Sequence, residues 1–316
     1  MIEPAKPGLE EARGSEAILE APSTASLFRG PSLPFIFLRL CLYLALDEGI
    51  SYALQWVARL ILPSGPYSSL PNRMMLRESI DLISAFFAAL VMSRFERRAF
   101  GEYGLPGRAA FGKMFWLGAS FGLVEISTVL GTVAALGGYR FGELAIHGSD
   151  LWRWAIFWGA FFLVVGFYEE FTFRGYVQFT MAQGVGFWPT AIVLSIIFGV
   201  MHSTNKGESW LGIAGVVVSG LFWCLTLRRT GSLWFAVGMH ASFDFAETFL
   251  YSVPDSGMIF PGHLSNATLR GPVWLTGGTA GPEASALDFL VLAVFFYVFH
   301  RLFPAKPTTN QPADET

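Results

Sequence analysis

The sequence contains little charge. Asp, Glu, Lys and Arg make up 14% of its 316 residues, whereas a soluble domain averages about 25%. Hydrophobic residues make up 53% of the chain, so the composition is that of a membrane protein and not of a soluble enzyme. The net charge is only −3, and the arginines are scattered, not striped along one face. A basic surface for nucleic acid is therefore absent, and we expect no nucleic-acid partner.

Cysteine is scarce as well. Cys41 and Cys224 both fall inside apolar runs, where a buried thiol behaves as a small hydrophobic group, so no disulfide scaffold is predicted. We expect no cleavable signal peptide in the first 33 residues, because they are rich in Pro, Gly, Ser and Glu and have no apolar core. We expect residues 1–33 and 304–316 to be disordered tails.

Long hydrophobic runs dominate the remainder. They predict an all-α polytopic membrane protein with about eight transmembrane helices, because about 20 apolar residues span a bilayer. Residues 34–303 would form one membrane-embedded domain. Asp47 and Glu48 interrupt the first run and leave open a span followed by an interfacial segment. The predicted spans are residues 34–62, 78–95, 112–137, 153–178, 187–204, 209–227, 232–252 and 285–303.

The basic residues beside these spans predict the orientation. Arginines and lysines gather between residues 94 and 113, at Arg228 and Arg229, and after Arg301. Positive residues are retained on the cytoplasmic side. Both termini are therefore expected in the cytoplasm.

Ionisable side chains within the spans are candidate functional residues, because placing one at membrane depth costs at least about 2.5 kcal/mol. The fourth run ends in Glu169, Glu170 and, four residues later, Arg174. This spacing favours a helical ion pair between Glu170 and Arg174. Adjacent helical residues point about 100° apart, so we expect the two glutamates not to face the same partner. Glu169 is then free to act as a general base.

Two histidine motifs follow on later spans. Phe198 precedes His202 by four residues, and Asn205 is expected one helical turn beyond, on the same side as His202. His240 precedes Asp244 by four residues, which places both on one helix face. Imidazole and carboxylate can bind Zn²⁺, hold a water for a glutamate or stabilise an oxyanion.

The ordered motifs Glu-Glu-x-x-x-Arg, Phe-x-x-x-His and His-x-x-x-Asp resemble those of the CPBP family of intramembrane proteases, which includes the type II CAAX prenyl endopeptidases and the bacterial Abi proteins. The resemblance covers residues 152–250. It implies an intramembrane endopeptidase in a bacterial inner membrane, acting within the lipid bilayer on peptide or protein substrates that include prenylated CAAX-type chains.

The resemblance also implies roles for the site residues. Glu169 and His202 would activate a water, while His240 and Asp244 would bind the scissile carbonyl or a metal. A zinc ion could be held by a set drawn from these four residues. Prenyl endopeptidases usually carry Asn at the position of Asp244, and an aspartate donates no hydrogen bond unless it is protonated, which favours metal ligation or orientation of His240. Glu170, Arg174, Phe198 and Asn205 would support the site.

Two other functions stay open at this point. Acids and histidines across spans also relay ions in transporters, and a family member without hydrolytic activity could scaffold a membrane partner. The predicted span starts disagree with a shared site. At 1.5 Å per helical residue, they place Glu169 and His240 in the cytoplasmic half of the membrane and His202 near the opposite membrane surface. The fifth span would then have to begin outside the bilayer or be tilted.

Overall fold

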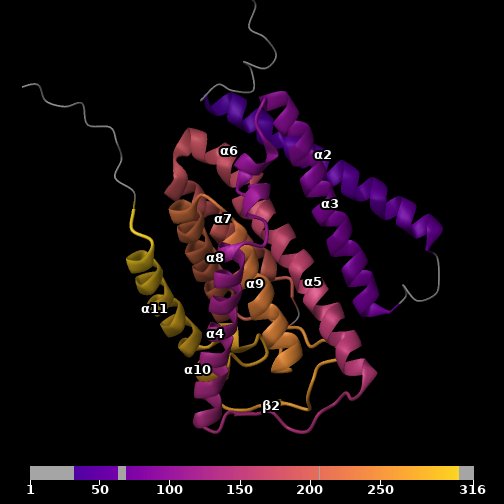
Figure 1. Ribbon diagram of the computed structural model, residues 1–316, viewed down its shortest axis with the longest axis vertical. Coiled ribbons are helices and arrows are strands. Elements are labelled where there is room, and N and C mark those ends of the chain that lie inside the picture. The colour runs from indigo at the N-terminus through magenta and orange to yellow at the C-terminus, as the bar shows by residue number, and fades with distance from the viewer. Residues whose placement is uncertain (1–31, 63–68, 206, 306–316) are drawn as a thin grey trace, which may run out of the picture.

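The computed structural model describes residues 32–62, 69–205 and 207–305. It shows a bundle of helices, with a long loop between residues 251 and 285 at one end (Figure 1). The predicted tails, residues 1–33 and 304–316, lie outside the described residues except for two residues at the inner end of each. Residue 33 already belongs to the first helix, so the predicted N-terminal boundary is one residue too long.

Each of the eight runs found in the sequence corresponds to a helix. These are α2 (Leu33–Ile61), α3 (Leu70–Glu96), α4 (Lys113–Ala135), α5 (Ser149–Arg174), α7 (Phe187–His202), α8 (Trp210–Thr230), α9 (Trp234–Phe245) and α11 (Ala286–Leu302). Among the described residues, three helical stretches are long and apolar enough to cross a membrane: Lys113–Ala135, Ser149–Val185 and Trp210–Thr230. The chain is an all-α membrane protein. Bilayer crossing by the other helices stays a prediction.

Several local features differ from expectation. The fourth run does not end at residue 178 as one helix, because α5 stops at Arg174 and a separate helix α6 (Tyr176–Val185) follows a break at Gly175. The first run continues as one helix through Asp47 and Glu48. These two acids interrupt the series of apolar residues but do not break the helix. The seventh run ends in a π-helical turn, η4 (Ala246–Leu250).

The loops hold small ordered elements that the sequence did not predict. Strand β1 (Tyr139–Arg140) pairs antiparallel with β2 (Thr268–Leu269) and ties the loop after α4 to the long loop that precedes α11. Single-turn elements η2 (Phe100–Tyr103), η3 (Gly107–Ala109), α10 (Val273–Thr276) and η5 (Pro282–Ala284) shape the remaining connections. The long loop is therefore folded against one end of the bundle (Figure 1).

Helix α9 lies between α4 and α5, and glycines permit the close approach. Gly118 and Gly122 on α4 have the GxxxG spacing that lets membrane helices pack backbone to backbone. A Cβ added to Gly118 would lie 2.0 Å from the Phe235 carbonyl oxygen, and one added to Gly238 on α9 would lie 2.2 Å from the Phe115 carbonyl oxygen. Every α9 residue from Trp234 to Ala241 is buried. This short central helix carries His240 and Asp244.

Helix α2 is attached to the bundle through a buried polar cluster. Arg39 forms an ion pair with Glu96, and its Nε lies 2.8 Å from Glu96 Oε1. The hydroxyls of Tyr103 and Tyr176 donate to the same carboxylate at 3.1 and 2.6 Å. The Glu96 oxygens are thus held by three side chains from α2, η2 and α6, as a buried charge requires.

Candidate active site

The predicted site residues line one internal cavity. It has a volume of about 430 Å³ and lies between α3, α5, α7, α8, α9 and the long loop. Glu169, His202, His240 and Asp244 all contribute to its wall. Phe198 and Asn205 line it as well, whereas Glu170 and Arg174 lie behind that wall, fully buried.

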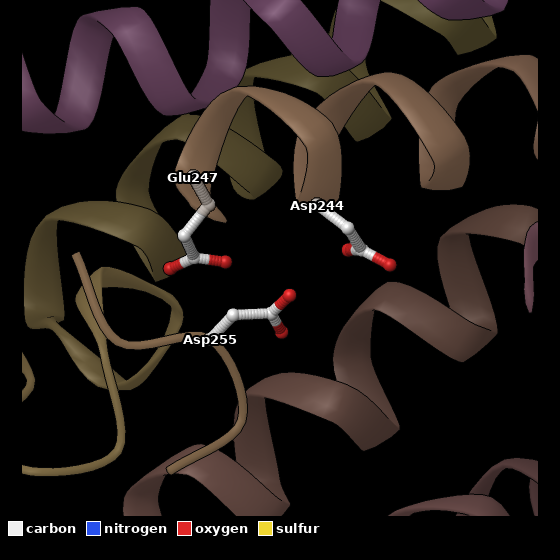
Figure 2. Close-up of side chains that lie close together, drawn as sticks. All are labelled: Asp244, Glu247 and Asp255. Carbon is white, nitrogen blue, oxygen red and sulfur yellow. The ribbon is translucent and has the colours of Figure 1, made fainter. Parts of the chain in front are cut away.

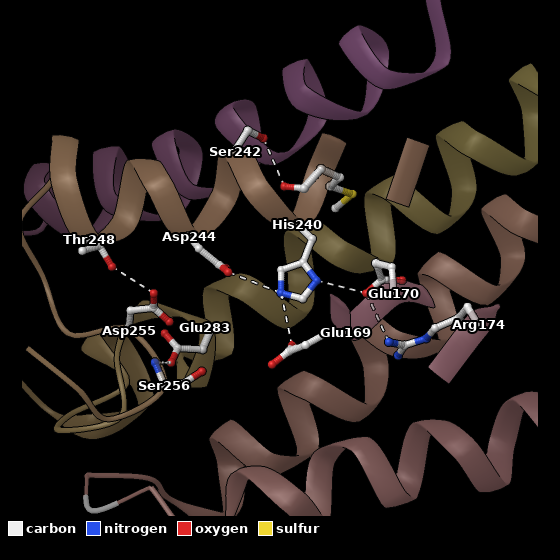
Figure 3. A network of polar contacts seen from close by, with 11 residues as sticks. Glu169, Glu170, Arg174, His240, Ser242, Asp244, Thr248, Asp255, Ser256 and Glu283 are labelled. Atoms are coloured by element: carbon white, nitrogen blue, oxygen red, sulfur yellow. Dashed lines mark hydrogen bonds and ion pairs between the residues drawn. The ribbon is translucent and has the colours of Figure 1, made fainter. Parts of the chain in front are cut away.

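His240 is the centre of the polar contacts (Figure 3). Its Nδ1 lies 3.0 Å from Glu170 Oε1, and its Nε2 lies 3.5 Å from Glu169 Oε2 and 3.3 Å from Asp244 Oδ2. The expectation that the adjacent glutamates face different partners is therefore wrong. They point in different directions from α5, but the imidazole lies between them and uses opposite ring nitrogens.

The contacts of His240 define its hydrogen-bonding role. An ionised carboxylate only accepts hydrogen bonds, so a ring that contacts carboxylates through both nitrogens acts as a double donor, the imidazolium form. The Trp223 ring lies parallel to the imidazole, with centroids 4.5 Å apart and 11° between planes, and a flat aromatic face stabilises a cation. Trp223 carries no ionisable group, so no local sequence pattern distinguishes it from the other tryptophans.

The predicted ion pair between Glu170 and Arg174 is present. Arg174 Nη1 lies 3.2 Å from Glu170 Oε1, and both side chains are fully buried. The guanidinium also lies over the rings of Phe198 and Trp223, with its Cζ 4.4 and 5.2 Å from their centroids. Glu170 therefore connects Arg174 to His240, a link that helical spacing alone could not reveal.

His202 is fixed through its own helix. Its Nδ1 lies 2.9 Å from the Phe198 carbonyl oxygen, and because a carbonyl only accepts, Nδ1 carries the proton. In the neutral ring Nε2 then keeps its lone pair for a water. Helix α7 ends at His202, so Asn205 lies in the following turn and not on the helix as expected; its N–H donates to the His202 carbonyl at 3.0 Å.

The disagreement over the depth of His202 has a structural cause. Helix α6 lies between α5 and α7, at the end of the bundle where α5 finishes (Figure 1). The start of α7 is therefore separated from the end of α5 by a complete helix, α6, most of which the sequence had left as a connection between the fourth and fifth predicted spans. His202, at the far end of α7, reaches the cavity that Glu169 lines.

The donor chemistry does not suit a zinc ion on the predicted ligand set. Both nitrogens of His240 contact carboxylates, so neither presents a free lone pair to a metal. Within the described residues, three ligand atoms that lie within 4.8 Å of one another are found instead at Asp244, Glu247 and Asp255. Zinc on the four predicted residues stays a prediction.

Acids from the long loop complete the cavity. Burial raises the pKa of Asp255 well above its usual range, and the nearby carboxylates of Asp244 and Glu283 add to the effect. Burial also raises the pKa of Glu283 to about 7. Both side chains line the cavity on the side of η4, so this end of the cavity is strongly acidic.

The fold and site define an all-α membrane protein whose buried acids and histidines surround a cavity large enough for water and a peptide segment. Residues 150–246 match the family described as Rce1-like, type II CAAX prenyl endopeptidase Rce1-like. This match supports the resemblance to the CPBP family of CAAX-type proteases that the sequence motifs indicated. The matched segment runs from α5 to the start of η4 and includes all eight predicted site and supporting residues. Neither the curated proteins nor the solved structures contain a match to the chain.

Proposed function

We propose that this chain is an intramembrane endopeptidase that hydrolyses peptide bonds of membrane-associated proteins with a water activated by Glu169 and His202. The observation that carries this proposal is the position of His240. It lies between Glu169, Glu170 and Asp244 in the cavity that His202 also lines. A base (Glu169), a water-binding imidazole (His202) and a cationic donor (His240) thus line the same cavity.

The proposed reaction begins with proton transfer from water. Glu169 accepts the proton, assisted by the Nε2 lone pair of His202, and the water oxygen attacks the scissile carbonyl carbon. The carbonyl oxygen becomes an oxyanion, to which the Nε2–H of His240 donates. The carbon–nitrogen bond then breaks, and the proton held by Glu169 passes to the leaving amine nitrogen.

Supporting residues keep His240 in its donor form. Glu170 accepts from Nδ1, and Asp244 lies beside Nε2. Asp244 acts here as a positioning group, because a carboxylate cannot donate to an oxyanion. Arg174 supplies the buried counter-charge that pairs with the Glu170 carboxylate.

We propose that the substrates are anchored by an apolar group. The cavity wall includes Phe161, Phe162, Phe243 and Phe260, which suit a lipid chain or an apolar segment. The family description points to a prenylated C-terminus as the first substrate to test.

The test uses purified protein in lipid nanodiscs and a matched pair of C-terminal peptides, one prenylated and one not. We expect cleavage of the prenylated peptide and a loss of about 10²–10⁴-fold for Glu169→Gln and for His202→Gln, the usual size of a general-base contribution. His263→Gln is the matched control, because His263 lies outside the cavity wall and bonds to the Phe260 carbonyl at 2.8 Å. Equal cleavage by Glu169→Gln and wild type would refute the proposal.

A further inference from the structure

A second group of carboxylates lies next to the candidate active site, beyond Asp244. Asp244 on α9, Glu247 on η4 and Asp255 in the long loop converge on one point (Figure 2). One oxygen from each lies within 4.8 Å of the other two. Glu247 and Asp255 fall after the segment that matches the family, so this group combines one motif residue with two from outside it.

One carboxylate oxygen of Glu247 is buried without a hydrogen-bond donor. Its side chain is 1% exposed, and its Oε1 has no hydrogen-bond donor. The neighbouring Glu283 is also buried and has an unpartnered Oε2. Glu247 and Glu283 come within hydrogen-bonding reach of each other. That contact requires a proton on one of the two carboxyl groups, whereas two ionised carboxylates would repel each other. A buried acceptor without a donor costs about 1–3 kcal/mol, and more when it is charged.

The surroundings supply little positive charge. Eight acids line the cavity: Glu78, Asp81, Glu125, Glu169, Asp244, Glu247, Asp255 and Glu283. Among the described lining residues the only Lys or Arg is Arg77, which is 74% exposed and whose Nε lies 3.6 Å from Asp81. His240 contacts Asp244 but neither of the other two ligand candidates in any described ion pair. Within the part of the chain that the structure describes, Glu247 and Asp255 are therefore buried acids that form no ion pair with a basic residue.

The donor set and its spacing select the class of ligand. Carboxylate oxygens without imidazole or thiolate suit hard cations and not zinc. Two oxygens bound to one Ca²⁺ can lie up to about 4.8 Å apart, whereas for Mg²⁺ the limit is about 4.2 Å, given their usual metal–oxygen distances. All three separations lie within 4.8 Å, an upper bound that admits one shared cation. Three carboxylates favour Ca²⁺, because Ca²⁺ accepts irregular geometry, whereas Mg²⁺ demands near-ideal octahedral geometry and usually keeps several waters with only one or two carboxylates.

We propose that Asp244, Glu247 and Asp255 form a binding site for a divalent, oxygen-preferring cation, with Ca²⁺ favoured over Mg²⁺. Glu283 lies beside Asp255 in the long loop (Figure 3). Its carboxylate would either balance the charge of the ion or bind it directly. Asp244 is shared, because its Oδ2 lies 3.3 Å from His240 Nε2. A bound cation would thus fix the carboxylate that positions His240 and close the long loop onto α9.

The test is binding of Ca²⁺ alone to the chelator-treated protein in nanodiscs at pH 8, measured by calorimetric titration and by thermal unfolding. We expect saturable binding of one ion with a rise in Tm, and affinity at least 10-fold weaker for Mg²⁺. Glu247→Gln and Asp255→Asn should each weaken Ca²⁺ binding at least 10-fold. Glu78→Gln is the matched control, because it removes an acid of the same cavity on α3 and should leave binding unchanged.

The alternative is that these carboxyls share protons. It predicts no Ca²⁺ binding and a higher Tm for the amide variants without any ion, and this result would overturn the proposal. If Glu247→Gln fails to fold, Asp255→Asn carries the test, since its amide oxygen can still accept the hydroxyl of Thr248 that now donates at 2.9 Å. Glu169→Gln should bind Ca²⁺ like wild type, so the site is tested independently of peptide hydrolysis.

Discussion

Substitution by glutamine should have different effects at the two adjacent glutamates: Glu170→Gln should destabilise the fold, whereas Glu169→Gln should abolish hydrolysis without unfolding the protein. Glu170 is fully buried and its Oε1 is shared by Arg174 at 3.2 Å and His240 at 3.0 Å. Glu170→Gln leaves the Arg174 guanidinium buried without a counter-charge. Breaking one side of a buried ion pair costs about 3–5 kcal/mol, and the amide oxygen of Gln keeps one acceptor, so we expect the lower end of that range.

Glu169 should behave differently. Its side chain is 22% exposed to the cavity and its ion-pair contact with His240 is 3.5 Å long. Partly exposed pairs contribute about 0–1 kcal/mol. Glu169→Gln should therefore stay folded while losing hydrolysis.

The assay is the free energy of unfolding in detergent micelles or nanodiscs for both single variants and for Glu170→Gln combined with Arg174→Gln. Removing both charges takes away the unpaired guanidinium, so the double variant should recover part of the stability lost by Glu170→Gln. Equal stability of the two single glutamate variants, or no recovery in the double variant, would refute the assignment of Glu170 to the buried ion pair and of Glu169 to hydrolysis.

Three further predictions concern packing and charge. Gly118→Ala should displace α9 and abolish folding or activity because its Cβ would meet the Phe235 carbonyl at 2.0 Å, whereas Gly131→Ala on the same helix meets nothing within 4 Å and should be neutral in expression and unfolding assays. Trp223→Ala should lower stability by about 3–5 kcal/mol and impair hydrolysis, while Trp223→Phe should retain most of both, because a ring stays stacked on His240. The raised pKa of Glu283, about 7 against its ordinary 4.5, means that the folded state binds the proton more tightly. Its contribution to stability should fall as pH rises from about 4.5 to about 7 in a metal-free buffer, and Glu283→Gln should remove this part of the pH profile of unfolding.

Much of the fold follows from hydrophobicity. A run of about 20 apolar residues can be satisfied in a membrane only as a helix, so the eight runs could be located with end errors of a few residues, the start of α3 being the largest. Helix α6 was missed because it is only ten residues long, too short for a membrane span, and most of it falls after residue 178, where the fourth span was predicted to end. Nothing in hydropathy distinguishes one long helix from two helices separated by a backbone break at Gly175.

The candidate site could be assembled from motif spacing only in part. The separation of four residues between Glu170 and Arg174 predicts their ion pair, because residues four apart lie on one helix face. It could not show that His240 lies between both glutamates, since that depends on the crossing of α5 and α9 at Gly166, where an added Cβ would lie 3.2 Å from the Val237 carbonyl oxygen. Trp223 and Asp255 come from elements whose tertiary positions no local pattern encodes.

The central claim is peptide hydrolysis that depends on Glu169. It is tested most directly by comparing new protein termini in membranes that contain the wild-type chain with those in membranes that contain Glu169→Gln at equal abundance. The account predicts a set of cleaved membrane proteins whose new termini appear with the wild type and disappear with Glu169→Gln. Identical sets of termini in the two membranes would contradict it.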